Sequence, residues 1–157
     1  MANIKIKHKG YVDIDKVIKK VSGILRAKKY NAFQDIYKYS AGGREVFFKA
    51  DKKVDEYAKY NLNVFVLAFG LKKVELIKNG KKTITKEGTV MVDINYYIDQ
   101  DHADAFGKNE FLVTLKKLFQ NTILNGRIFG KYRKENEADA VEVAKEIRKI
   151  LEHETSW

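Results

Sequence analysis

The 157-residue sequence contains no cysteine and no proline. Without cysteine, the chain has no disulfide, no thiolate nucleophile and no cysteine-ligated zinc or iron-sulfur site. Without proline, its turns must be built from glycine, asparagine and aspartate. The longest nearly apolar run, residues 64–71, is far shorter than the ~18 residues of a membrane span, and residues 1–10 lack the apolar core of a signal peptide. We therefore expect a soluble, cytoplasmic protein.

Positive charge is concentrated at the N-terminus. The chain has 31 lysines and arginines against 21 aspartates and glutamates, a formal net charge of +10. Residues 1–30 carry nine basic and two acidic side chains, residues 31–99 carry twelve and nine, and residues 100–157 carry ten and ten. The excess is mostly lysine, which suits a solubilising surface or diffuse phosphate contacts better than the bidentate base recognition of arginine.

The first thirty residues predict a strand followed by a helix. Ile4, Ile6 and His8 alternate with lysines, which is the pattern of a strand with one buried face. We expect His8 to be a buried, hydrogen-bonded side chain and not a ligand. From about residue 14 to 29, apolar residues recur at helical spacing behind Asp13, which can cap the first turn. They are Ile14, Val17, Ile18, Val21 and Leu25.

Residues 31–99 predict antiparallel strands. Apolar and polar residues alternate over residues 45–50, 61–67 and 89–99. The second half of the 61–67 strand is apolar on both faces, so we expect it to be central or covered on both sides. Between residues 74 and 85, Asn79 and Gly80 supply the positive φ angles that a two-residue type I′ hairpin requires.

The last third predicts helices and completes a single domain of residues 1–157. One apolar stripe runs from Phe111 to Ile123 and another from Val141 to Leu151, with Asn136 as the expected N-cap of the second helix. Gly126 and Gly130 mark a break or a kink between the two stripes. The predicted fold class is α+β: a strand, a helix and an antiparallel sheet of about five to six strands, wrapped on a long C-terminal helix.

This order of elements resembles the helix-grip, or START-like, superfamily. Residues 53–99 also look similar to uncharacterised archaeal proteins that carry the same V-D-x-Y, G-L-x-x-V-E and N-G-K-K phrases. The resemblance implies a curved sheet around the C-terminal helix with an apolar ligand between them, and it implies no activity. Two features depart from the superfamily: the terminal helix is divided by glycines, and only one helix follows the first strand.

The aromatic residues allow two interpretations. The sequence holds nine phenylalanines and nine tyrosines, many of them in the predicted strands, and ordinary core packing is the simplest use for them. If the sheet curls around the terminal helix, however, five residues would line a ligand pocket between them. These candidates are Phe48, Tyr96, Phe111, Leu115 and Phe119.

Residues 96–106, YYIDQDHADAF, contain the densest acidic cluster. Oxygen-rich spacing of this kind can bind Mg²⁺, Mn²⁺ or Ca²⁺, but no EF-hand glycine or distal glutamate completes a loop. The favoured interpretation is a solvated strand-to-helix turn. A metal-dependent nuclease is the alternative enzyme hypothesis. Asp51-x-Lys53 has the acidic-x-Lys spacing of an element of such nucleases. The candidate cation ligands are Asp99, Asp101, His102 and Asp104.

The functional expectation is a binding module and not an enzyme. No G-x-S-x-G, H-E-x-x-H or P-loop motif is present, and no cofactor is expected. An apolar small molecule or a protein partner is the favoured ligand. The alternative is weak, sequence-independent nucleic-acid binding through lysines of the first strand and helix, if these elements form one patch. Those lysines are Lys5, Lys7, Lys9, Lys19, Lys20, Lys28 and Lys29.

Overall fold

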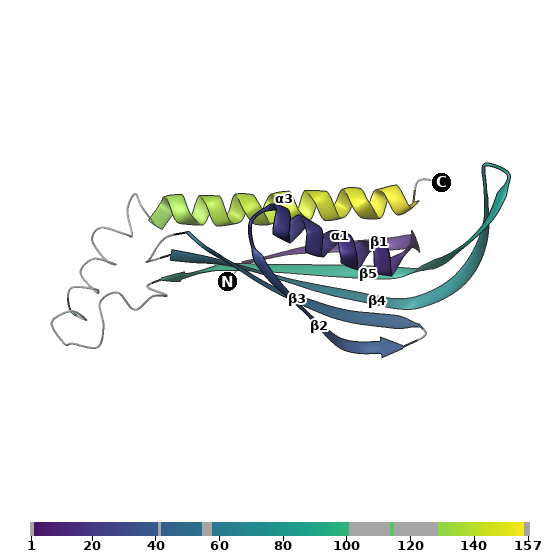
Figure 1. The fold of residues 1–157 in the computed structure, drawn as a ribbon, viewed down its shortest axis with the longest axis horizontal. Coiled ribbons are helices and arrows are strands. Elements are labelled where there is room, and N and C mark those ends of the chain that lie inside the picture. Colours follow the sequence, from purple (N-terminus) through teal and green to yellow (C-terminus); the bar gives the residue numbers. More distant parts are fainter. Residues whose placement is uncertain (1, 41, 55–57, 101–113, 115–128, 156–157) are drawn as a thin grey trace.

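The protein is a two-layer α+β structure with both helices on one side of a single sheet (Figure 1). The computed structural model describes residues 2–40, 42–54, 58–100, 114 and 129–155. Helices α1 (Ile14–Ala27) and α3 (Phe129–Thr155) form one layer. The other layer is an open antiparallel sheet of five strands in the order β1-β5-β4-β3-β2, which confirms the predicted class and strand orientation. The strands are β1 (Ala2–Val12), β2 (Asn31–Ser40), β3 (Gly43–Lys53), β4 (Ala58–Lys78) and β5 (Lys81–Gln100).

The first strand and helix form as their sequence patterns predict. In β1, Ile6 is buried while Lys5 and Lys7 are exposed. His8 is half-buried, and its Nε2 lies 3.4 Å from the carbonyl oxygen of Tyr11. The carboxylate of Asp13 caps α1 by accepting a hydrogen bond from a backbone N–H of the first turn. All five predicted apolar positions of α1 are buried: Ile14, Val17, Ile18, Val21 and Leu25.

Strands β4 and β5 are longer than the sequence predicts. The strand expected at residues 61–67 continues into the first arm of the hairpin, which gives one strand of 21 residues. The second arm of the hairpin continues into the strand expected at residues 89–99, which gives one strand of 20 residues. Asn79 and Gly80 have φ angles of 52° and 76°, which confirms the type I′ turn. A bulge between Phe69 and Lys72, where Gly70 has a φ of 64°, lets the strand bend without ending.

Helix α3 covers β1, β5 and β4, whereas α1 covers β2 and β3. The side chains between helices and sheet form one buried cluster, which includes Phe48 and Leu62 of the sheet and Ile147 of α3. The predicted N-cap role of Asn136 was wrong, because α3 begins at Phe129 and Asn136 is buried within the helix. Strong helix formers before Asn136 extend the helix towards its N-terminus.

Candidate functional site

The face of the sheet that points away from α1 and α3 carries an apolar patch. Phe65 and Leu67 of the central strand β4 lie on this face, because the alternate residues Val64 and Val66 are buried against the helices. Cross-strand pairing places Phe47 of β3 beside Phe65 and Met91 of β5 beside Leu67. We call these residues the open-face patch: Phe47, Phe65, Leu67 and Met91.

The open-face patch is accessible in the described part of the chain. Met91 is 40% exposed, and Phe69, which continues the same row of β4, is 44% exposed. Neither described helix lies on this side of the sheet (Figure 1). A hollow of about 450 Å³ lies elsewhere, but the patch itself has a shallow hollow of about 260 Å³ between the side chains of Lys5, Phe65, Leu67 and Met91. The patch is therefore an accessible apolar surface with a hollow on the side of β1.

Charged side chains border the open-face patch at both edges. Lys5 and Lys7 extend from the same face of β1 and are exposed. On the other side of the patch, Glu45, Lys49 and Asp51 of β3 lie on the same face as Phe47, so this edge carries both signs. An apolar centre with a charged rim is the usual anatomy of a protein interface.

Two polar atoms next to the patch are buried without a hydrogen-bond partner among the described residues. They are Oδ1 of Asn63 on β4 and Oδ1 of Asp93 on β5. Asp93 lies opposite Lys5 on one side and Phe65 on the other. A buried acceptor without a donor costs about 1–3 kcal/mol.

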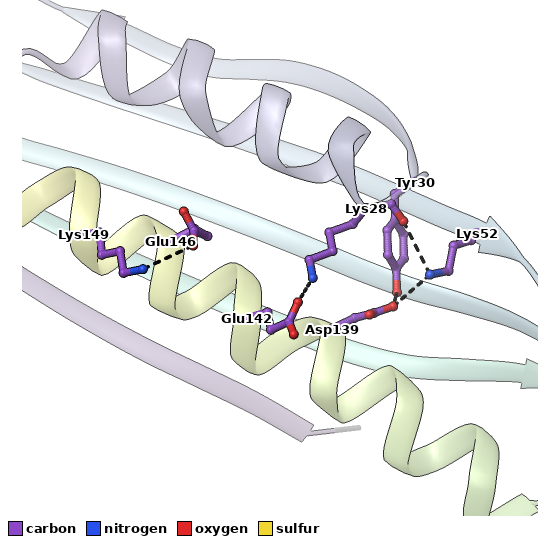
Figure 2. A network of polar contacts seen from close by, with 7 residues as sticks. All are labelled: Lys28, Tyr30, Lys52, Asp139, Glu142, Glu146 and Lys149. Atoms are coloured by element: carbon purple, nitrogen blue, oxygen red, sulfur yellow. Dashed lines mark hydrogen bonds and ion pairs between the residues drawn. The ribbon is translucent and has the colours of Figure 1, made fainter.

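A second cluster of polar residues lies between α3 and the sheet (Figure 2). Asp139 of α3 accepts hydrogen bonds from the Tyr30 hydroxyl at 2.8 Å and from Lys52 Nζ at 3.0 Å. Lys52 Nζ also lies 4.9 Å from the centre of the Tyr30 ring and 5.8 Å from that of Tyr60. The Tyr60 hydroxyl donates to Glu135 at 2.6 Å.

The electrostatics of this cluster stabilise the neutral tyrosines. Burial raises the pKa of Tyr30 above its ordinary value, and the hydrogen bond to Asp139 raises it further. Burial and the hydrogen bond to Glu135 raise the pKa of Tyr60 in the same way. The charged and polar groups satisfy one another, so the cluster joins α3 to the sheet. No sequence signal linked these residues, because Tyr30 and Asp139 are far apart in the chain.

The structure places only part of the predicted ligand pocket. Phe48 is fully buried in the core and is 1% exposed. Tyr96 packs against the edge of that core and lines the hollow of about 450 Å³ beside Arg133 and Asn136. Phe111, Leu115 and Phe119 lie outside the described residues. The pocket between sheet and terminal helix stays a prediction.

The predicted lysine patch is divided between the two layers. Lys5, Lys7 and Lys9 extend from the open face of β1, at the sheet edge opposite to β2. Lys19, Lys20, Lys28 and Lys29 belong to α1 or its C-terminal turn, in the helix layer. Lys28 also forms an ion pair with Glu142 of α3. The structure therefore does not bring these lysines together on one surface.

Of the predicted cation ligands, only Asp99 is described. Its Oδ2 accepts a hydrogen bond from Asn61 Nδ2 at 2.8 Å and lies 4.0 Å from Lys59 Nζ. Asp101, His102 and Asp104 lie outside the described residues. Within the described ranges, no group of three or more His, Asp or Glu side chains is arranged to hold a metal ion. The cation site and the nuclease hypothesis that includes Asp51 and Lys53 stay predictions.

Comparisons with family models, with curated proteins and with solved structures found no match.

Within the described part of the chain, neither helix combines the length and the apolar character needed to cross a membrane.

Proposed function

We propose that this chain is a binding module whose open-face patch docks a protein partner, and that the partner is a second copy of the same chain. The observation that carries the proposal is the position of the apolar residues. They are centred on β4, which is the middle strand of the five-stranded sheet. An apolar surface centred on the middle strand suits face-to-face packing of two sheets.

The symmetry of such a pair follows from the distribution of charge. A two-fold axis along β4, in the plane between the two sheets, places the apolar centre of each chain over that of the other. The same axis places the β1 edge of one chain, with Lys5 and Lys7, over the β3 side of its partner, where Glu45 and Asp51 alternate with Phe47 and Lys49. An axis across the strands would instead bring the lysine edges together.

The area of the face is sufficient for a stable dimer. Five strands spaced ~4.8 Å apart, with about nine residues each at ~3.3 Å per residue, cover roughly 700 Å² per chain. A dimer would bury about 1,400 Å² in total, within the range of standard protein interfaces.

The helix-grip arrangement is part of the same proposal. An antiparallel sheet with a long C-terminal helix on one face supports it. In this arrangement the side of the sheet that faces the helices forms the core, and the opposite face is available to a partner.

The test is the mass of the protein in solution, measured by light scattering after size exclusion. We expect twice the chain mass of 18.2 kDa at a protein concentration of about 0.1 mM. At that concentration, a dimer with a micromolar dissociation constant is almost completely formed. Leu67→Glu should produce a monomer, because it places a charge at the centre of the apolar contact. Ile77→Glu is the matched control, since Ile77 lies away from the open face and is 81% exposed. It should remain dimeric.

Cross-linking tests the face itself, because the natural chain has no cysteine. Facing sheets are about 10 Å apart, beyond the reach of a disulfide, so a short bismaleimide is the suitable reagent. Leu67→Cys should give a covalent dimer, whereas Lys19→Cys on α1 should not. A monomer at every concentration, or equal cross-linking of both variants, would contradict the proposal. A monomer that binds an apolar dye at the patch would assign this face to a small molecule instead.

A further inference from the structure

The β4–β5 hairpin ends in an arm, residues 71–88, whose outer part projects beyond the rest of the sheet as two strands (Figure 1). The pairing of β3 with β4 ends at Phe69, and that of β1 with β5 ends at Lys86. Beyond these points, residues 74–78 and 81–85 pair only with each other, whereas Lys72 and Lys73 pair with Glu87 and Lys86, which also pair with β1. In Figure 1 the arm curves towards the side of the sheet that carries the helices, away from the open-face patch.

The base of the arm is held by close packing. Leu71 is buried, and its backbone N–H donates to the carbonyl oxygen of Gly42 at 3.0 Å. A Cβ added to Gly88 would lie 2.8 Å from Leu71 Cδ2 and 3.0 Å from the Phe69 carbonyl oxygen. The absence of a side chain at Gly88 therefore allows the two strands to bend together. The arm leaves the domain in a defined direction.

The arm is strongly basic. Residues 71–88 contain six lysines and two glutamates, a net charge of +4, and three of the lysines lie on each strand. Lys73 and Lys86 are directly opposite in the register. Like charges at directly opposed positions destabilise a strand pair, so the arm would gain from a bound anion.

One face of the arm combines part of this charge with exposed apolar side chains, and on this face Lys82 forms an ion pair with Glu75 at 3.0 Å. Ile77 is 81% exposed and Ile84 is 68% exposed. Ile77 pairs with Lys82, and Ile84 pairs with Glu75, so the two isoleucines are diagonal neighbours on the face that also carries Lys73 and Lys86. A two-stranded ribbon is marginally stable by itself, which makes a bound partner favourable for this element.

The shape of the arm fits the groove of one kind of nucleic acid duplex better than that of another. A two-stranded ribbon fits the major groove of B-form DNA, which is about 12 Å wide and has a phosphate backbone on each side. Lysines on both strands can reach both backbones, and the exposed isoleucines can contact thymine methyl groups. The part of the arm that pairs with no other strand would extend ~17 Å for five residues per strand. The deep, narrow major groove of A-form RNA does not admit such a ribbon.

We propose that the arm, residues 71–88, binds the major groove of double-stranded DNA through phosphate contacts that do not depend on sequence. The arm contains no arginine, so it lacks the side chain that most often reads guanine. The affinity is weak and salt-dependent, with dissociation constants of ~10⁻⁴ to 10⁻⁶ M near physiological salt.

The experiment compares two variants that lose the same charge. The arm variant carries Lys72→Gln, Lys73→Gln, Lys81→Gln and Lys86→Gln. The control variant carries Lys16→Gln, Lys19→Gln, Lys20→Gln and Lys29→Gln, all in or next to α1. Binding is measured by fluorescence anisotropy of a labelled 30-base-pair duplex at rising salt.

The unmodified chain should bind the duplex with a salt slope of up to about −5, corresponding to six phosphate contacts. The arm variant should bind at least ~30-fold more weakly at 0.1 M salt. The slope of its log affinity against log salt concentration should be less negative by about 3 to 4. The control variant should bind within about threefold of the unmodified chain. The melting temperature of the arm variant should stay nearly unchanged, because it loses the like-charge pair of Lys73 and Lys86 together with the opposite-charge pair of Lys72 and Glu87.

Three outcomes would overturn the proposal. Equal losses in both variants would show that binding depends on net charge alone. Equal or tighter binding to a single-stranded 30-mer or to an RNA duplex would exclude the groove geometry. Tighter binding to phosphatidylserine vesicles than to DNA would assign the exposed isoleucines to a membrane surface.

Discussion

Asp139→Ala tests whether the polar cluster of Figure 2 stabilises the contact between α3 and the sheet. The Asp139 side chain is 20% exposed and that of Lys52 is 26% exposed, so their ion pair is only partly screened by water. The substitution removes one hydrogen bond from a neutral hydroxyl and one from an ammonium group. At ~1 kcal/mol for the first and ~1.5–3 kcal/mol for the second, the free energy of unfolding should fall by about 2–4 kcal/mol.

Urea denaturation measures this loss. With an m-value of about 2 kcal/mol/M, the midpoint should move down by about 1–2 M at constant m. Glu146→Ala is the matched control, because its ion pair with Lys149 lies on the same helix at 3.6 Å and is exposed. It should cost less than about 0.5 kcal/mol.

A double-mutant cycle separates the ion pair from general packing effects. Lys52→Met retains much of the alkyl chain of Lys52 and removes its charge. The double variant should be more stable than the sum of the single losses predicts, with a coupling energy of about 1–2 kcal/mol. Additive losses, or an Asp139→Ala cost no larger than that of Glu146→Ala, would refute this account of the cluster.

Two further predictions concern pH and backbone packing. Unfolded tyrosines ionise near pH 10, and burial holds the pKa values of Tyr30 and Tyr60 above that value in the folded state. Their contribution to stability is therefore complete below about pH 10 and is lost as pH rises further, so urea midpoints should fall as the pH is raised above about 10, and less so in Tyr30→Phe. An unchanged midpoint would contradict the cause given for the shift. Gly88→Ala should destabilise the fold by about 1–3 kcal/mol, because its Cβ would contact Leu71 at 2.8 Å. Gly130→Ala, with nothing within 4 Å in the first turn of α3, should stabilise it by about 0.5–1 kcal/mol, and thermal melts compare the two. The same sign for both variants would contradict this packing argument.

The local patterns of the sequence predict the elements whose formation depends on neighbouring residues. Asp13 and the apolar spacing behind it predict α1, and Asn79-Gly80 predicts the turn, because caps and type I′ turns are set by a few adjacent side chains. The apolar character of both faces around Phe65 correctly predicts a central strand. The same apolar residues indicate the open-face patch, because a row of apolar side chains on the second face of a strand is usually covered by another element or another chain.

The features that depend on tertiary arrangement could not be predicted in this way. The lysines of β1 and α1 are adjacent in sequence, but the helix packs on the sheet face opposite to Lys5 and Lys7. The bond between Tyr30 and Asp139 joins residues 109 positions apart. The arm had a visible signal in the lysines around the turn, but its length depends on where β1 and β3 stop pairing.

The continuity of the β4–β5 hairpin has a consequence for how the chain reaches its fold. A single turn sets the register for both the arm and the middle of the sheet, from Lys78 and Lys81 out to Ala58 and Gln100. A one-residue slip at this turn would exchange the two faces of a strand, so that Phe65 would point towards the helices and its buried neighbours towards water. The hairpin contacts are local, whereas β1 must join β5 across the sequence separation from Ala2 to Tyr96. An early hairpin would therefore provide the template on which β1 and, later, α3 assemble.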